Sequence, residues 1–410
     1  MSKMHLQCIR CKKIYELKEL YLCDECGGIL EVQHNYLGKK DRVIHELLRL
    51  PSFNIWKYKN LLPVEDPGHM VTLFEGGTPL IKGNHLSKKT GFGKLYFKDE
   101  SRNPSGAFKD RPMAVGVSKA KEFGREIVVT ASSGNAAASL ATYAAKAGLK
   151  SYIFIPESTP PGKVSQAFVN GGIIIKVKGS YSNAYAVAKM AAREFHWMNI
   201  TTTFLNPYAV EGDKTIAYEL YHQLDRKVPD WILVPTGAGP LVFGIYKGFT
   251  ELNFLGLTDK KPRMAAVQAE GCAPIVQAFE SGSRKVDAWG TPGTIASAIA
   301  DPLKGYEQDG ELVLEIVHDS RGTAVAVSDD EILGAVFDLA KNEGIYSEPG
   351  AAVSYAGFKK LSENNVIKEK QSVVCVITGH GLKDPGSAAE NLNIPVIGPD
   401  LEELKSHIKL

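Results

Sequence analysis

The sequence lacks an apolar run long enough to cross a membrane, and its first residues lead into no apolar signal-peptide core. It also lacks an excess of either charge, because 48 basic and 46 acidic residues leave a formal net charge of +2. Extensive nucleic-acid binding usually needs a strongly basic face, so we expect neither nucleic acid nor a membrane as a partner. We therefore expect a cytoplasmic protein.

Isolated cysteines are also scarce. Only Cys272 and Cys375 stand apart from the two Cys-x-x-Cys pairs, and the apolar neighbours of Cys375 predict a buried side chain. A chain of 410 residues, 44% of them hydrophobic and 23% charged, is an ordinary globular composition that can bury a large core in two or three units. We find no internal repeat and no low-complexity tract.

The four remaining cysteines form two pairs separated by eleven residues, and two glycines follow the second pair. Four thiolates on two hairpin turns suit a tetrahedral zinc ion, and a closed site of this kind is structural. Disulfides or unliganded thiols are the alternative. A nucleic-acid or partner module is disfavoured because no basic cluster with interleaved aromatic residues is present. We therefore predict a zinc ribbon over residues 1–34, with the ligands Cys8, Cys11, Cys23 and Cys26.

Beyond an aromatic-rich, partly helical connector over residues 35–75, strands and helices alternate. The alternation is clearest over residues 126–195, and apolar strands return near 231–234, 264–267 and 372–377. Repeated strand–helix units whose strands are continuously apolar indicate an α/β fold with parallel sheets covered on both faces. The predicted strands are 126–131, 151–155 and 173–177, and the predicted helices are 135–147, 161–169 and 182–195. Residues 281–323 show no clear pattern.

Two short runs carry the strongest chemical signal. Lys109 stands where an extended loop becomes a predicted helix, a position at which an amine can hold an aldehyde cofactor as a Schiff base. A lone lysine is more often a solvated surface charge, so the second run matters. It is a polar turn at the carboxyl end of the strand 126–131, where α/β sheets bind small molecules. The turn consists of Ser132, Ser133, Gly134 and Asn135.

A glycine-bearing loop follows the strand 231–234 and opens a predicted helix, as expected for a site that binds one phosphate monoester. The alternative is an ordinary strand–helix turn. Thr378 ends the strand 372–377, where its hydroxyl can bond a heterocyclic nitrogen. His380 could be a general base, but between two glycines we favour a loop residue satisfied by backbone. The loop residues are Thr236, Gly237, Ala238, Gly239 and Pro240.

These motifs occur in a recognisable order. The ribbon is followed by residues 98–111, 133–139, 211–215, 268–271 and 378–384, and the set spans roughly residues 1–390. In this order the chain resembles the threonine synthase family, which are pyridoxal-phosphate enzymes of the fold type II, or tryptophan-synthase-β-like, group. The resemblance implies two parallel-sheet α/β domains and a homodimer. We expect a large domain from residues 35–105 and 206–390, a small domain from 106–205, and a tail from 391–410.

The resemblance also implies roles for the residues. Lys109 would form the Schiff base with pyridoxal phosphate and, once freed, remove the α-proton of the substrate. Asn135 would contact the ring hydroxyl, the loop 236–240 the phosphate, and Thr378 the pyridine nitrogen. The turn 132–135 would hold the carboxylate of an amino-acid substrate. The implied reaction converts O-phosphohomoserine and water to threonine and phosphate.

Three departures leave the substrate open. Ala136, Ala209 and Ala238 stand where the family usually has Thr, Arg and Asn around the substrate phosphate, so charge-assisted hydrogen bonds are lost. The alternative is a related enzyme that catalyses β-replacement or β-elimination on another amino acid, such as serine or O-phosphoserine. A cofactor-binding regulator without activity is a further alternative, which retention of Lys109, Asn135 and Thr378 disfavours.

Overall fold

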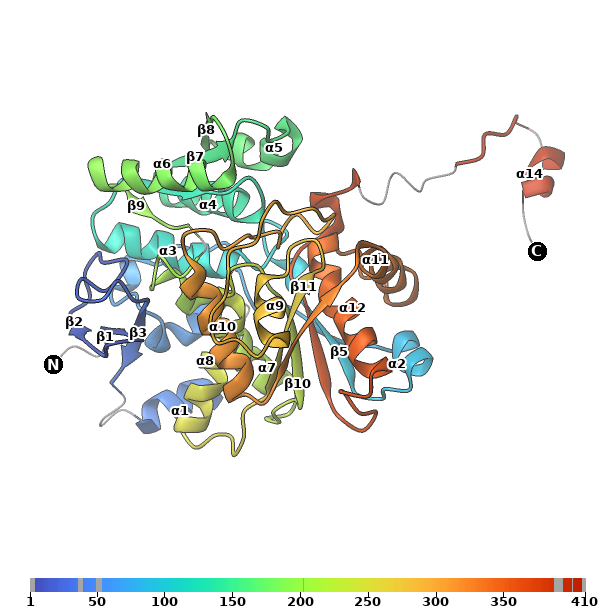
Figure 1. Ribbon diagram of the computed structural model, residues 1–410, viewed down its shortest axis with the longest axis horizontal. Coiled ribbons are helices and arrows are strands. Elements are labelled where there is room, and N and C mark those ends of the chain that lie inside the picture. Colours follow the sequence, from blue (N-terminus) through green and yellow to red (C-terminus); the bar gives the residue numbers. More distant parts are fainter. Residues whose placement is uncertain are drawn as a thin grey trace.

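The computed structural model describes residues 4–35, 40–48, 54–201, 203–386, 394–399 and 401–407. Three sheets organise these residues (Figure 1): a small antiparallel sheet near the amino terminus, a four-stranded parallel sheet, and a six-stranded mixed sheet. No described helix is both long and apolar enough to span a bilayer. The expected tail 391–410 is described only over 394–399 and 401–407, and its residues 391–393, 400 and 408–410 lie outside the described residues.

The amino-terminal sheet has the order β2-β1-β3, with β1 (Met4–Cys8) antiparallel to β2 (Ile14–Tyr15) and to β3 (Leu30–His34). Its inward residues Leu6 and Val32 are fully buried and belong to one core with the connector residues Ile55 and Trp56. The ribbon therefore packs on the body of the protein. The connector contains α1 (Lys40–Leu48), η1 (Ile55–Leu61) and η2 (Pro67–His69).

The six-stranded sheet has the order β12-β11-β10-β13-β5-β4, and all neighbours are parallel except β4 and β5. Its adjacent strands β10 and β13 are continuously apolar, as expected for strands covered on both faces. Along β13, Val374 and Val376 face one core, whereas Val373, Cys375 and Ile377 face the other. The strands are β4 (Leu80–Lys82), β5 (Leu95–Asp99), β10 (Trp231–Pro235), β11 (Arg263–Ala269), β12 (Thr323–Val327) and β13 (Val373–Ile377).

Helices α7, α8, α9 and α10 supply the first of these cores, and α2, α11 and α12 supply the second. Figure 1 shows α8 and α10 on one side of the sheet and α11 and α12 on the other. The helices are α2 (His85–Thr90), α7 (Thr215–Gln223), α8 (Pro240–Phe254), α9 (Pro274–Glu280), α10 (Glu307–Asp319), α11 (Asp329–Glu343) and α12 (Pro349–Glu363); a short helix α14 (Leu401–His407) follows near the carboxyl terminus. Short 3-10 turns are η3 (Glu100–Arg102), η4 (Ala209–Gly212) and η5 (Gly381–Lys383).

The four-stranded sheet is parallel throughout, in the order β8-β7-β6-β9. Ala184, Ala188 and Ala192 recur every fourth residue of α6 and form the stripe that packs on one face. Helices α3, α4 and α5 cover the other face. The strands are β6 (Ile127–Ala131), β7 (Lys150–Pro156), β8 (Ile173–Val177) and β9 (Met198–Asn199), and the helices are α3 (Asp110–Glu122), α4 (Asn135–Ala147), α5 (Pro161–Val169) and α6 (Tyr181–Glu194).

The predicted α/β fold with two parallel sheets is confirmed, as are the strand–helix alternation over 126–195 and the later strands. Helices 135–147 and 161–169 begin and end as predicted. Of the interval 281–323 that showed no clear pattern, residues 281–306 contain neither helix nor strand, whereas residues 307–319 form α10, which the sequence reading missed. Cys375 is fully buried, as its apolar neighbours indicated.

Candidate active site

A cavity of about 270 Å³ opens where the carboxyl ends of β6, β10 and β13 meet. Parallel strands direct their carboxyl ends to one edge, which is the usual place for ligands in such sheets. The cavity brings together segments far apart in sequence. Its walls include Phe108 and Lys109, residues 131–136, 235, 237–241 and 297–302, together with Tyr181, Thr203, Glu348 and Thr378.

Lys109 immediately precedes α3 and projects into this cavity. The loop before it is pinned to the end of β13, because the Phe108 N–H donates to the Thr378 carbonyl at 2.9 Å and Ala107 bridges to Gly379. Burial lowers the pKa of Lys109 to about 8, although the carboxylates of Asp213 and Asp301 oppose this shift. About a tenth of the lysine is therefore a neutral, nucleophilic amine at pH 7, far more than for a lysine with the usual pKa of about 10.4.

The turn Ser132–Asn135 leads from β6 into α4. The Ser132 N–H donates to the Phe154 carbonyl at 3.2 Å, and the Gly134 N–H donates to the Ser132 hydroxyl at 3.3 Å. All four residues line the cavity. The amino end of a helix of 13 residues thus faces the cavity with its unpaired N–H groups, which favours a bound anion.

The glycine-bearing loop joins β10 to α8, as the sequence predicts. Gly239 has a φ of 100°, and a Cβ atom there would lie 2.0 Å from Cγ2 of Val313. Only glycine fits this position. Gly237, Ala238, Gly239 and Pro240 line the cavity, whereas the Thr236 hydroxyl turns back to donate to the Val234 carbonyl at 2.7 Å.

Thr378 and His380 follow β13. Thr378 is buried and lines the cavity. The Nδ1 atom of His380 accepts a hydrogen bond from the Leu382 N–H at 3.1 Å and caps the turn η5. This contact supports the interpretation of His380 as a loop residue satisfied by backbone.

Three carboxyl groups near the lysine were not singled out from the sequence. Burial raises the pKa of Asp213 to about 7 and that of Glu348 to about 7, and it also raises the pKa of Asp301. Asp301 and Glu348 line the cavity, and Asp301 accepts a hydrogen bond from the Tyr306 hydroxyl at 2.7 Å. Asp213 lies in the run 211–215, which belongs to the ordered set of motifs in the sequence. Its side chain does not cap α7, since the residue before that helix is Lys214, which makes no side-chain cap.

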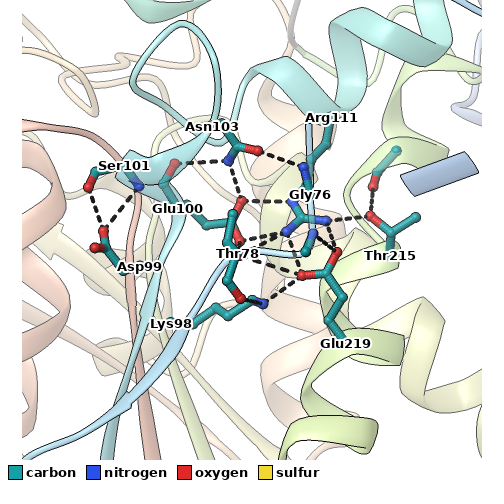
Figure 2. A network of polar contacts seen from close by, with 12 residues as sticks. Gly76, Thr78, Lys98, Asp99, Glu100, Ser101, Asn103, Arg111, Thr215 and Glu219 are labelled. Atoms are coloured by element: carbon teal, nitrogen blue, oxygen red, sulfur yellow. Dashed lines mark hydrogen bonds and ion pairs between the residues drawn. The ribbon is translucent and has the colours of Figure 1, made fainter. Parts of the chain in front are cut away.

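A buried ion network surrounds Arg111, two residues after Lys109 in the chain (Figure 2). The Arg111 guanidinium donates to both oxygens of Glu100 at 2.7 and 2.8 Å, and to both oxygens of Glu219 at 2.6 and 2.8 Å. Lys98 donates to Glu219 at 2.6 Å. Two cations and two carboxylates therefore balance in the interior and join β5 and η3 to the first turn of α3 and to α7.

At the other end of the chain, the sulfur atoms of Cys8, Cys11, Cys23 and Cys26 all lie within 4.8 Å of one another. The pairs Cys8–Cys26 and Cys11–Cys23 are 3.5 Å apart, far beyond the roughly 2.05 Å of a disulfide bond. This spacing suits tetrahedral thiolate ligands about 2.3 Å from a zinc ion. A Cβ atom at Gly28 would lie 3.0 Å from the Cys8 sulfur, which accounts for glycine after the second pair.

Comparisons with known proteins agree with this site. Residues 71–379 match a family described as pyridoxal-phosphate dependent enzyme. The chain is 42% identical over 407 residues to a threonine synthase of Methanocaldococcus jannaschii, covering 98% of this chain and 99% of that one. It is 42% identical over 396 residues to a threonine synthase of Methanosarcina acetivorans, covering 96% and 95%.

Among solved structures, the fold is similar to the processed form of threonine deaminase isoform 2 from Solanum lycopersicum, with a TM-score of 0.67 and 21% identity over 86% of this chain and 92% of that one. It is also similar to maize serine racemase, with a TM-score of 0.65 and 25% identity over 80% and 93%. The expected fold type II architecture is confirmed. The chain belongs to the pyridoxal-phosphate dependent enzymes and, among them, to the threonine synthase family.

Proposed function

We propose that this enzyme is a threonine synthase that converts O-phosphohomoserine and water to threonine and phosphate. The observation that carries the proposal is the placement of Lys109, with its lowered pKa, in one cavity with the turn 132–135 and the loop 237–240. Similarity to threonine synthases over nearly the whole chain supports the same reaction.

The cavity residues fit pyridoxal phosphate. Lys109 supplies the amine that an aldehyde needs, and residues 237–239 supply N–H groups at the start of a helix of 15 residues. The buried hydroxyl of Thr378 would bond the pyridine nitrogen, and Asn135 would bond the ring hydroxyl. Thr236 would shape the loop and not contact the cofactor through its hydroxyl, because that hydroxyl donates to the Val234 carbonyl.

When bound, pyridoxal phosphate supplies an electron sink that makes the α-proton of the amino acid acidic. The protein supplies binding and proton transfer. Residues 132–135 would hold the substrate carboxylate at the amino end of α4. The amine of Lys109, whose pKa lies at about 8, would remove the α-proton and then a β-proton, and would return protons to Cγ and Cα as phosphate leaves from Cγ and water adds at Cβ.

One observation favours a second candidate reaction. Ala136 and Ala238 line the cavity without a polar side chain, and Ala209 is buried outside it. Among the described residues that line the cavity, Lys109 is the only cation, and it faces the carboxyl group of Asp301. An uncharged leaving group suits such a wall better than a phosphate dianion. Elimination or replacement at Cβ of serine is therefore the second candidate.

Product analysis separates the two reactions. The reconstituted enzyme would be incubated in turn with O-phosphohomoserine, O-phosphoserine and serine, and threonine, phosphate and pyruvate would be measured. Threonine from the first substrate, absent with Lys109→Ala, supports threonine synthase. Product from serine alone would refute it in favour of the second candidate.

We further propose a structural zinc ion on the four ribbon cysteines, a cytoplasmic location and a homodimer. The sulfur spacing supports the metal. We also propose a division into a large domain, 35–105 with 206–390, and a small domain, 106–205. All strands of the six-stranded sheet lie in the first, and all strands of the four-stranded sheet lie in the second. Within these ranges, residues 36–39, 49–53, 202 and 387–390 lie outside the described residues.

A further inference from the structure

Glu348 is a buried carboxyl group that the proposed chemistry leaves without a role. It immediately precedes α12, is 4% exposed, and lines the cavity. Its Oε1 atom accepts a hydrogen bond from Nδ2 of Asn135 at 2.7 Å, although the two residues are 213 positions apart. The contact joins α12, on the six-stranded sheet, to α4, on the four-stranded sheet.

The backbone around Glu348 is also fixed, by hydrogen bonds to the segment that follows β13. Its N–H donates to the Gly379 carbonyl at 3.1 Å, and Ser347 bridges to His380. A Cβ atom at position 379 would lie 2.2 Å from Oε1 of Glu348, so a side chain there would displace the carboxyl group. The carboxyl group therefore lies between Asn135 and the segment that follows Thr378, in contact with both.

This contact fixes the orientation of the side-chain amide of Asn135. An ionised carboxylate only accepts hydrogen bonds, so it selects the NH₂ end of the amide. That nitrogen carries two hydrogens, and only one is used by Glu348. The other remains for a ligand in the cavity. Without the carboxylate, the amide could rotate and present its carbonyl oxygen instead, which would repel the ring oxygen of the cofactor.

We propose that Glu348 is a positioning residue that orients the side-chain amide of Asn135 so that its second N–H is directed to the ring oxygen of pyridoxal phosphate. The inference rests on the proposed function only in taking that cofactor as the ligand. Glu348 acts through Asn135 and takes no part in proton transfer to the substrate.

The charge of Glu348 makes this role depend on pH. Burial raises its pKa to about 7, and Asp384 raises it further, whereas Lys383, Lys163 and the hydrogen bond from Asn135 lower it. Above this pH the carboxylate accepts from the amide. Below it the carboxyl group is protonated and no longer selects the NH₂ end, so cofactor binding weakens.

The test compares Glu348→Gln, Glu348→Ala and wild type as full-length protein, using the dissociation constant of pyridoxal phosphate between pH 5.5 and 9. Glutamine keeps an acceptor oxygen but does not titrate. Because it is uncharged like the protonated acid, we expect it to bind the cofactor at pH 8 about as weakly as wild type does at pH 5.5, and to lose the part of the pH dependence centred near 7. Alanine should weaken binding about tenfold, as expected for a lost hydrogen bond to a charged acceptor.

A second comparison uses Asn135→Ala. If Glu348 acts only by positioning Asn135, the double variant Asn135→Ala/Glu348→Ala should bind pyridoxal phosphate no more weakly than Asn135→Ala alone. Glu363→Gln, an exposed change at the far end of α12, is the matched control and should leave every value unchanged. Additive losses in the double variant, or an unaltered pH profile in Glu348→Gln, would overturn the inference. Absence of cofactor binding by wild type would instead refute the proposed function.

Discussion

Replacing Arg111 with methionine would remove the cation shared by two buried carboxylates. Arg111, Glu100 and Glu219 are at most 7% exposed at the side chain, so water cannot take over the lost contacts. Breaking a buried pair by removing one partner costs about 3–5 kcal/mol. Glu219 keeps Lys98, whereas Glu100 keeps only neutral donors from Thr78 and Asn103.

The chain contains a matched control nine residues away. Arg102 pairs with Asp99 at 3.1 Å, but its side chain is 64% exposed. Exposed pairs contribute about 0–1 kcal/mol. Thermal unfolding of wild type, Arg111→Met and Arg102→Met would be compared at one pH and one cofactor concentration. We expect Arg111→Met to lower Tm by about 10 °C, at roughly 2–4 °C per kcal/mol, and Arg102→Met to lower it by at most a few degrees.

The pH dependence gives a second criterion. In wild type, Arg111 and Lys98 hold the pKa of Glu219 well below its usual range, so its contribution persists across neutral and mildly acidic pH. In Arg111→Met the pKa of Glu219 should rise from this low value, because one of the two cations that hold it down is removed. The loss of stability should then be complete above that raised pKa and shrink as the pH falls below it. Equal losses in the two variants, or a deficit that grows on acidification, would refute the reasoning.

Four further outcomes are expected. Lys109→Ala should abolish both the visible absorption band of the lysine-bound cofactor and product formation; a surviving band would place the link elsewhere. In wild type, the rate of cofactor capture should rise with pH up to about 8, since the pKa of Lys109 lies at about 8 and only the neutral amine attacks an aldehyde; a rate that stays flat from pH 6 to 8 would contradict this. Metal analysis should find one zinc per chain and none in Cys11→Ser, whereas an unchanged content would exclude the ribbon site. Gly239→Ala should weaken cofactor binding at least about tenfold, given the strain of a left-handed alanine and its clash with Val313, while Gly282→Ala, with a φ of 70° and open space around it, should not.

Much of the site was readable from the sequence because its signals are local. The cysteine spacing, the turn 132–135, the loop 236–240 and the position of Lys109 each depend on a few consecutive residues beside a strand or a helix. The structure brings Lys109, Asn135, Gly237, Gly239 and Thr378 into one cavity. The roles assigned to them remain predictions.

The carboxyl groups were missed for the opposite reason. Asp213, Asp301 and Glu348 look like ordinary surface acids, because nothing in their neighbouring residues predicts burial. Asp301 lies in the interval without periodicity, and its partner Tyr306 is recognisable only in the fold. A buried acid is identified by its distant contacts.

The order of residues along the chain was sufficient to determine the strand–helix alternation and the parallel sheets, and to single out the lysine proposed for the chemistry, since periodicity and turn residues act over short distances. Only the tertiary structure decided that Arg111 would meet Glu219 and that Asn135 would meet Glu348. These pairs are 108 and 213 residues apart, and they meet because the helices that carry them pack together around the two sheets. Burial at these positions removes water from the charged groups. The groups therefore bond to one another, and their pKa values shift.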